Sequence, residues 1–238
     1  MFAKLLTRAS CLLFPPECET CGSLLPLAAS SGVCRSCAAE IKFLTPPFCE
    51  TCGRSLRQDT ARCAACAGKT FHFDRAYSCA LYEGKMKSLM HAYKFEGRKI
   101  LSGFFSEILL GFIRRRLQET AWDAVAAVPL DGAKEKARGF NQSELLSRRV
   151  SRALGVPHLS RRIHRKKSKH PQSLLGRAER GENVKNCFFT PRGKPRMPGR
   201  LLLIDDILTT GQTASECART LKEAGSSFVT VLTLARGV

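Results

Sequence analysis

The sequence predicts an α/β protein in which a mainly parallel, doubly wound sheet follows a small cysteine-rich module. Eight of the 12 cysteines lie in Cys-x-x-Cys pairs before residue 70. After residue 70, short apolar runs alternate with segments of helical periodicity, which is typical of a parallel sheet with helices between its strands. The run 201–213, LLLIDDILTTGQT, begins with four aliphatic residues, which is typical of a strand buried on both faces. Two carboxylates and a turn that contains glycine follow it. We therefore expect two domains, 1–70 and 71–238.

The four Cys-x-x-Cys pairs predict two structural Zn(II) sites in a tandem zinc-ribbon module. Tetrahedral zinc usually takes four thiolates from two such pairs, and here consecutive pairs are separated by the length of a hairpin. The alternatives are a disulfide scaffold, which needs an oxidising compartment, and an iron–sulfur site, whose spacings tend to be more compact. The expected ligands are Cys18, Cys21, Cys34 and Cys37 for one ion and Cys49, Cys52, Cys63 and Cys66 for the other.

The remaining elements are predicted from apolar spacing and turn residues. A short helix is expected within 1–14, before the first cysteine pair. In chain order, strands are expected at 74–82, 124–130, 186–190, 201–204 and 227–235, and helices at 85–95, 100–119, 144–154 and 214–224.

The run 201–213 combines three groups with separate chemical uses. Asp205 and Asp206 follow the strand, at the carboxyl edge where open α/β sheets bind ligands. The segment 209–213 offers hydroxyl and N–H donors before a helix, and a helix N-terminus favours phosphate. Carboxylates that accept bonds from vicinal hydroxyls beside a phosphate cradle predict a ribose-5-phosphate site. An incidental acidic turn is the alternative interpretation.

A second polar segment follows the strand predicted at 124–130. It contains Lys134, Lys136 and Arg138 and continues into Gly-Phe-Asn-Gln at 139–142. In a doubly wound sheet this turn would lie at the same carboxyl edge as the two aspartates. Pyrophosphate bound with Mg(II) needs cations on that side. An ordinary polar loop with a glycine turn is the alternative.

The chain is strongly basic, with a formal net charge of +19. The stretch 134–200 alone carries 19 Lys and Arg residues against 4 Glu. Such a balance points to polyanionic partners, although a solvated basic surface is the simpler explanation. No apolar run reaches the length of a membrane span, and no cleavable export signal is recognisable. We therefore expect the chain to act in the cytoplasm or at the inner face of the cytoplasmic membrane.

The run 201–213 resembles the phosphoribosyl-pyrophosphate (PRPP) motif of type I phosphoribosyltransferases. The whole chain resembles the ComF family of phosphoribosyltransferase-like proteins. That resemblance rests on the Cys-x-x-Cys array, Tyr82-Glu-Gly, Tyr93-Lys-Phe, Val128-Pro-Leu, Arg138-Gly-Phe-Asn-Gln142, Gln172 with Arg177 and Asn183, and 203–213. It implies a double zinc ribbon before a type I phosphoribosyltransferase domain, PRPP and Mg(II) as ligands, and, for competence members, a role in uptake of single-stranded DNA. No segment resembles a base-recognising hood, so the phosphoribosyl acceptor stays open.

The first functional hypothesis is a phosphoribosyltransferase that transfers the sugar from PRPP with the help of Mg(II). Asp205 and Asp206 would hold the ribose hydroxyls and orient the metal indirectly. Lys136, Arg138 and one residue of a predicted lid at 170–183 would stabilise the departing pyrophosphate. The expected cradle for the 5-phosphate consists of Thr209, Thr210, Gly211 and Thr213.

The second hypothesis is a non-catalytic zinc-ribbon protein that binds single-stranded DNA and uses PRPP as a regulatory ligand or not at all. Basic residues would contact the DNA backbone, and Tyr82, Tyr93, Phe95 and Phe140 are candidates for stacking on bases, although aromatics with such spacing are more often core residues. A third hypothesis is a zinc-stabilised scaffold for a competence helicase or channel protein.

Overall fold

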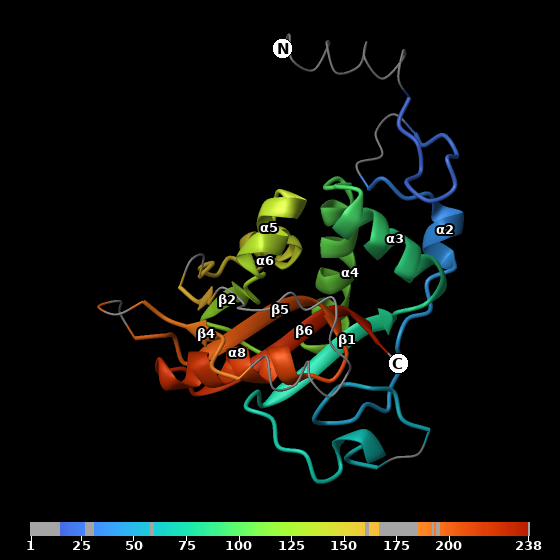
Figure 1. Cartoon of the computed structure of the whole chain (residues 1–238). Helices are drawn as coiled ribbons and strands as arrows, with labels where there is room; N and C mark the ends of the chain where they lie inside the picture. Colours follow the sequence, from blue (N-terminus) through green and yellow to red (C-terminus); the bar gives the residue numbers. More distant parts are fainter. Residues whose placement is uncertain are drawn as a thin grey trace.

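The centre of the molecule is a four-stranded parallel sheet (Figure 1). The computed structural model describes residues 15–26, 31–57, 60–159, 162–166, 185–191, 193 and 196–237. Across the sheet, the strands are β1 (Arg75–Leu81), β6 (Phe228–Arg236), β5 (Arg200–Leu208) and β2 (Ala124–Ala127). All three neighbouring pairs are parallel, so the carboxyl ends of β5 and β2 meet at one edge.

Helices cover both faces of the sheet, as a doubly wound fold requires (Figure 1). One face is covered by α3 (Gly84–Phe95), α4 (Leu101–Arg116) and α6 (Gln142–Leu154). The other face carries α8 (Gln212–Glu223) and a two-stranded ribbon of β3 (His164–Arg165) and β4 (Phe188–Phe189). The short helix α5 (Gly132–Arg138) lies between β2 and α6 in the chain.

Successive side chains of a central strand point to opposite faces of the sheet, which explains why both faces are apolar. In β5, Leu202 and Ile204 belong to the core under α3, α4 and α6, whereas Leu201 and Leu203 belong to the core under α8. All four side chains are fully buried. A strand whose two faces are both covered needs a continuous apolar run, which is what the sequence contains at this position.

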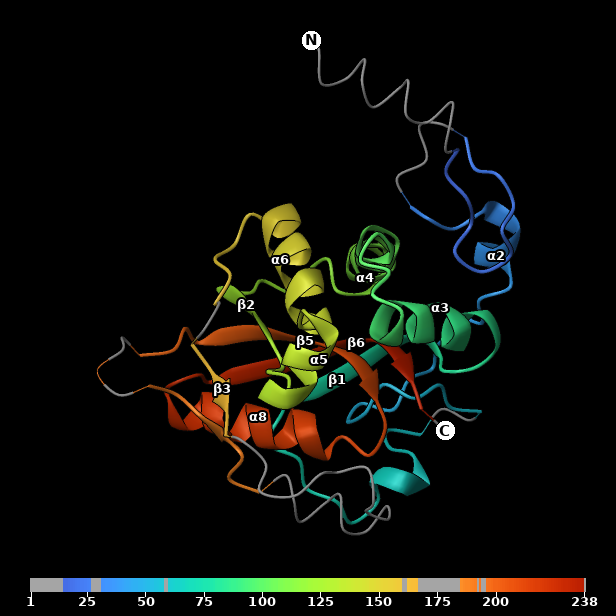
Figure 2. The same cartoon turned by 45° about the horizontal axis from the view of Figure 1, so that its top comes forward.

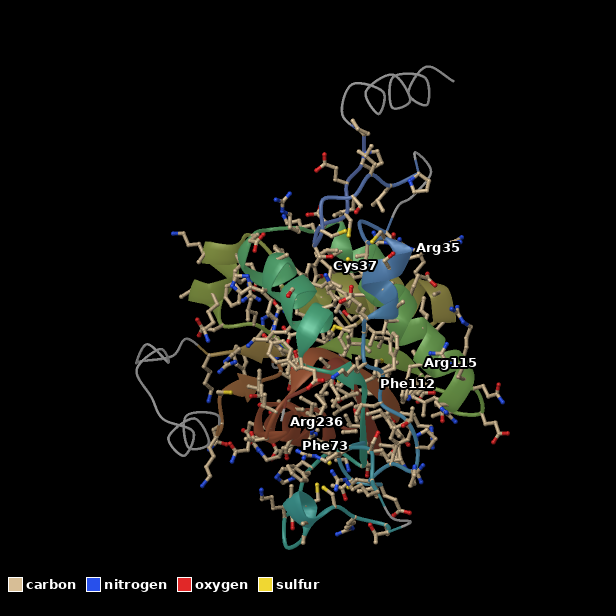
Figure 3. The ribbon with its side chains drawn as sticks, turned by 90° about the vertical axis from the view of Figure 1, so that its right-hand side faces the viewer. Arg35, Cys37, Phe73, Phe112, Arg115 and Arg236 are labelled. Carbon is tan, nitrogen blue, oxygen red and sulfur yellow. The ribbon has the colours of Figure 1, made fainter. Side chains whose placement is uncertain are left out.

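The cysteine-rich module divides into two ribbons that lie on different sides of the sheet (Figures 1 and 3). The first ribbon contains α2 (Arg35–Ala39) and lies beside α3 and α4. The second ribbon contains the short 3-10 helix Ala64–Cys66 and lies beside the start of β1. In Figure 3, Cys37 marks the first ribbon, while Arg236 and Phe73 lie toward the second.

The parallel α/β sheet and the N-terminal pair of four-cysteine clusters confirm the predicted fold class. Several elements differ in detail, and among them the strand expected at 124–130 ends at Ala127. The central strand does not end at Ile204 but continues to Leu208, because residues 207–208 still pair with 235–236 of β6. The basic segment 132–138 is a helix rather than a turn, and the strand expected at 186–190 is reduced to two residues. The helix expected within 1–14 and the lid expected at 170–183 lie outside the described residues.

Candidate functional site

The eight paired cysteines form two clusters with the predicted partners. Within each cluster the four sulfur atoms all lie within 4.8 Å of one another. The Sγ atoms of Cys21 and Cys34 are 3.7 Å apart, as are those of Cys52 and Cys63. Zn–S bonds of about 2.3 Å in a tetrahedron place sulfurs about 3.8 Å apart. Both clusters therefore fit one zinc ion each, with no ligand position left for chemistry.

The two ribbons repeat the same hydrogen bonds, with an offset of 31 residues at the first cysteine pair and 29 at the second. The amide of Gly22 donates to the carbonyl of Cys18, and the amide of Gly53 donates to that of Cys49. Both glycines have positive φ angles, 70° and 64°, which residues with a Cβ rarely adopt. In each ribbon the first sulfur also accepts a 3.4 Å bond from the amide of the third cysteine. The module is thus a true structural repeat.

At the carboxyl edge of the sheet, Asp205 and Asp206 are surrounded by donors from α3 and α6. Lys94 Nζ lies 2.8 Å from Asp206 Oδ2, and Gln142 Nε2 donates to the same oxygen at 2.6 Å. Ser143 Oγ donates to Asp205 Oδ1 at 2.9 Å. Burial and the neighbouring charge of Asp206 raise the pKa of Asp205 to about 7. This edge therefore holds two adjacent carboxylates, both contacted by donors from α3 or α6.

Each residue of the segment 138–142 has a separate structural task. Gly139 ends α5 with a positive φ of 77°, and Phe140 is buried against Tyr93. Asn141 caps α6 through the amides of residues 143 and 144, and its Nδ2 also donates to the carbonyl of Val128. Arg138 donates to Gln142, which in turn donates to Asp206. The segment therefore connects the loop after β2 to the carboxylates of β5.

The loop 209–213 leads directly from β5 into α8. Gly211 occupies the N-cap position with a φ of 81°, and no side chain caps the helix from that position. Thr210 Oγ1 accepts a bond from the amide of Gln212 at 3.4 Å. A 12-residue helix that begins this way presents backbone N–H groups and a positive dipole end toward the sheet edge.

These groups face one pocket of about 400 Å³. Figure 2 shows α5 and the end of α3 over this edge of the sheet. Four cations line it, from three elements: Lys94 of α3, Lys134 and Arg138 of α5, and Arg165 of β3. The remaining polar lining consists of Gln142, Asp205, Asp206, Thr209, Thr210, Gln212 and Thr213. One pocket thus holds two carboxylates between a cationic side and a hydroxyl-rich loop.

The structure brings together most of the site residues predicted from the sequence. The exceptions are Lys136 and Gly211, which do not line the pocket, whereas Lys134 and Arg138 do. Residues four apart share one face of a helix and residues two apart do not. Because 132–138 is a helix, Lys134 takes the place expected of Lys136. Gly211 contributes as the backbone N-cap of α8 rather than as a side chain.

The aromatic residues considered for base stacking separate into two groups. Tyr93 is fully buried and Phe140 is 7% exposed, and both belong to the core beneath α3 and α4. Tyr93 and Phe140 are therefore core residues, as the alternative interpretation had it. Phe95 is 67% exposed, and the guanidinium of Arg138 lies 5.4 Å from its ring centre.

Sequence reasoning missed Lys94, Ser143 and Arg165 as parts of the site. Lys94 lies on a helix that follows β1, far from the other site residues in the chain, and no spacing rule links it to Asp206. Ser143 stands next to the segment 138–142, and Arg165 is one residue of a long basic run. For Lys94, the available signal was its place in the motif Tyr93-Lys-Phe.

Comparison with known proteins identifies the N-terminal cysteine-rich module. Residues 9–68 match the model of the double zinc ribbon domain. Competence protein F of Haemophilus influenzae is 30% identical over 224 residues, which cover 92% of this chain and 96% of that protein. The chain belongs to the ComF family. DNA utilization protein YhgH of Salmonella typhimurium is also 30% identical, over 94% of this ComF chain and 99% of the relative.

Solved structures overlap with part of the ComF chain. Adenine phosphoribosyltransferase from Thermoanaerobacter pseudethanolicus is 16% identical, with a TM-score of 0.38 over 63% of this chain and 74% of its own. Orotate phosphoribosyltransferase from Aeropyrum pernix is 17% identical, with a TM-score of 0.36 over 63% and 64%. Among the described residues, no helix is long and apolar enough to cross a membrane.

Proposed function

We propose that the pocket at the carboxyl edge binds PRPP with Mg(II) and that the protein transfers the phosphoribosyl group to an acceptor. The observation that carries this proposal is the order of groups in one pocket. Arg138 is linked to Asp206 through Gln142, and the loop 209–213 continues from the strand that carries Asp205 and Asp206, so the carboxylates stand between a cationic group and the loop. PRPP has the same order, with ribose hydroxyls between a 5-phosphate and a diphosphate.

Each part of PRPP would have a matching group. The amides at the start of α8 and the hydroxyls of Thr209, Thr210 and Thr213 would hold the 5-phosphate. Asp205 and Asp206 would accept bonds from the ribose hydroxyls. Lys134 and Arg138 would contact the diphosphate, because paired cations favour that charge. Since Asp206 is bound by Lys94 in the structure, PRPP would compete with this ion pair.

The transfer itself needs charge stabilisation rather than a covalent enzyme intermediate. The acceptor nucleophile forms a bond to the anomeric carbon as the bond from that carbon to the diphosphate oxygen breaks. The electron pair leaves with pyrophosphate, and the proton of the acceptor is released to solvent. Mg(II), which prefers oxygen ligands, would neutralise charge on the diphosphate. Lys134 and Arg138 stabilise the same developing charge from the side of α5.

Calorimetric titration with PRPP and Mg(II) tests the binding step. The wild-type chain is expected to bind, and Asp205→Asn/Asp206→Asn is expected to abolish detectable binding. Lys134→Ala is expected to weaken binding by about tenfold to a hundredfold, in the range of a lost charge-assisted contact. Lys136→Ala is the matched comparison, since it removes the same charge from the same helix away from the pocket. Equal affinity of all four proteins would refute the proposal.

A groove between α4 and α6 favours a second candidate function, the binding of single-stranded DNA. It has a volume of about 380 Å³, and its lining includes Phe104, Glu107, Arg149 and Arg152 together with Ser31 of the first ribbon. Phe104 is half-buried and both arginines are exposed. An aromatic ring beside two guanidinium groups suits a base and its flanking phosphates. The names of the relatives, competence protein and DNA utilization protein, agree with a nucleic-acid partner.

Fluorescence polarisation with an oligo-dT strand tests this second function at several salt concentrations. If both arginines contact phosphates, Arg149→Ala/Arg152→Ala should reduce the slope of log affinity against log salt by about 1.4. Arg57→Ala/Arg62→Ala removes two exposed charges from the second ribbon and serves as the control. Identical slopes for the two double variants would place the DNA elsewhere. Binding of DNA without pyrophosphate release under any condition would favour the non-catalytic hypothesis, with PRPP as a regulatory ligand.

A further inference from the structure

The second ribbon touches the beginning of α8 through Phe71. This ring packs against the cluster formed by Cys49, Cys52, Cys63 and Cys66. It also covers Gly211, because a Cβ atom built there would lie 3.1 Å from Phe71 Cε1. The amide of the next residue, His72, donates to Ser215 Oγ in the first turn of α8 at 2.9 Å. One side chain thus lies between the metal cluster and the N-cap of the helix.

A second connection reaches the other end of the loop through the last residues of β6. Arg236 Nη1 donates to the carbonyl of Cys52 at 3.2 Å. Arg236 is also the register partner of Leu208, the residue before the loop. The amide of Gly237 donates to the carbonyl of Leu208 at 3.0 Å, and a Cβ on Gly237 would lie 2.9 Å from Thr209. The loop 209–213 is therefore attached to the second ribbon at both ends.

The charge of Arg236 makes this connection sensitive to the metal. Arg236 is 6% exposed, and in the part of the chain that the structure describes no carboxylate lies within ion-pair distance of it. A buried cation is costly unless an opposite charge lies nearby. Four thiolates around one Zn(II) carry a net charge of −2. The loaded second cluster supplies the missing negative charge.

The first ribbon has different neighbours. Its Glu19 pairs with Arg98 at 3.3 Å, and a Cβ on Gly32 would lie 3.2 Å from Ile100 at the start of α4. Lys85 of α3 lies near Cys37, whose charge raises the pKa of this lysine. These partners lie on α3 or in the connection between α3 and α4, on the opposite side of the sheet from α8.

We propose that zinc at the second cluster positions the loop 209–213 through Phe71 and Arg236, whereas zinc at the first cluster does not. Phe71 and Arg236 are then positioning residues for the phosphate cradle. The consequence for PRPP affinity rests on the proposed function, but the effect on the loop does not. Coupling between two sites usually changes affinity by about fivefold to a hundredfold, and loss of Phe71 should fall in that range.

Hydrogen–deuterium exchange of the full-length, zinc-loaded protein tests the positioning directly. Phe71→Ala should speed exchange of the amides at 209–215 at least severalfold, while the central strands β5 and β6 stay protected. Phe71→Leu should restore part of the protection, because it keeps apolar contact with Gly211. The matched control is Phe43→Ala, which removes a 47% exposed ring from the segment between the ribbons. Metal analysis should still find two zinc ions per chain in all three variants.

The inference would be overturned if the amides at 209–215 exchanged at the same rate in Phe71→Ala as in the wild type. An equal increase across β5 and β6 would overturn it too, because the effect would then be global unfolding. Calorimetry with PRPP and Mg(II) on the same proteins separates the two proposals. If the wild type binds no PRPP while Phe71→Ala still loosens the loop, the proposed function fails and the positioning stands. If PRPP binds equally to wild type and Phe71→Ala, the loop is not positioned through Phe71 for its ligand.

Discussion

The two ribbons share a sequence pattern and a hydrogen-bond pattern but differ in what they touch. In the first cluster Cys21 is exposed and the cluster packs beside α3 and α4. In the second cluster all four cysteines are buried, and the neighbours are β1, β6 and the loop before α8. A repeated metal-binding unit therefore has no fixed role. Its role depends on the surface that covers it, and here one copy lies by a basic groove and the other by the proposed PRPP pocket.

Removing one zinc site at a time is expected to have the largest effect. Structural zinc contributes on the order of 10 kcal/mol in zinc-finger peptides, so either loss should unfold its ribbon. Cys63→Ser/Cys66→Ser should weaken PRPP binding by about a hundredfold and leave oligonucleotide binding within about threefold, within the usual limits of coupling between sites. Cys34→Ser/Cys37→Ser should show the opposite pattern. Metal content, calorimetry and fluorescence polarisation give the three measurements, and equal losses in both variants would break the comparison.

The pH dependence of PRPP binding should be the next largest effect. The ribose hydroxyls require an ionised Asp205, whose pKa is raised to about 7. Below pH 7 binding must displace a proton, so affinity should fall about tenfold per pH unit. Asp205→Asn should remove this part of the pH profile. A profile that is unchanged by the substitution would show that Asp205 does not titrate with binding.

The raised pKa of Asp205 also makes the free energy of unfolding of the ligand-free protein depend on pH. Because the folded-state pKa of Asp205 lies above its unfolded value, the stabilisation from the protonated form is present at low pH. It is lost as the pH rises through about 7. Asp205→Asn should therefore raise the free energy of unfolding at pH 8 by about 1 to 3 kcal/mol, and by much less at pH 4. Urea denaturation at the two pH values provides the measurement.

The ion pair that anchors the first ribbon should matter least. Arg98 is 54% exposed where it pairs with Glu19, and exposed pairs contribute about 0.5 kcal/mol or less. Arg98→Ala should therefore leave both thermal stability and PRPP affinity nearly unchanged. Arg236→Met should cost more than about 1 kcal/mol, because it removes a buried cation beside the second cluster. Thermal unfolding curves that rank these two variants in the reverse order would contradict the contrast between the ribbons.

The sequence predicted the groups that act locally. The pairing of Cys18 and Cys21 with Cys34 and Cys37 follows from short spacings, and the buried strand before Asp205 follows from an uninterrupted apolar run. The helix at 132–138 escaped prediction because the segment is seven residues long and has no buried residue, so its apolar pattern is weak. Asp131, which caps this helix through the amides of Ala133 and Lys134, was the available signal.

Contacts between distant segments could not be predicted from spacing. Lys94 reaches Asp206 because the parallel sheet brings the carboxyl ends of β1 and β5 to one edge. Phe71 reaches Gly211 because the segment before β1 runs along α8. In the sequence, Arg236 is only a polar residue at the end of a predicted strand. In the structure it donates a hydrogen bond to the carbonyl of Cys52, 184 residues away. The ligand set of each zinc was therefore predictable, and the function of each ribbon required the structure.

The most direct test of the proposed pocket is a crystal structure of the full chain with Mg(II) and PRPP. We expect the 5-phosphate on the amides at the start of α8, the ribose hydroxyls on Asp205 and Asp206, and the diphosphate beside Lys134 and Arg138. The ion pair between Lys94 and Asp206 should be opened. Saturating PRPP that leaves this pocket empty, or that binds elsewhere with the ion pair intact, would contradict the assignment.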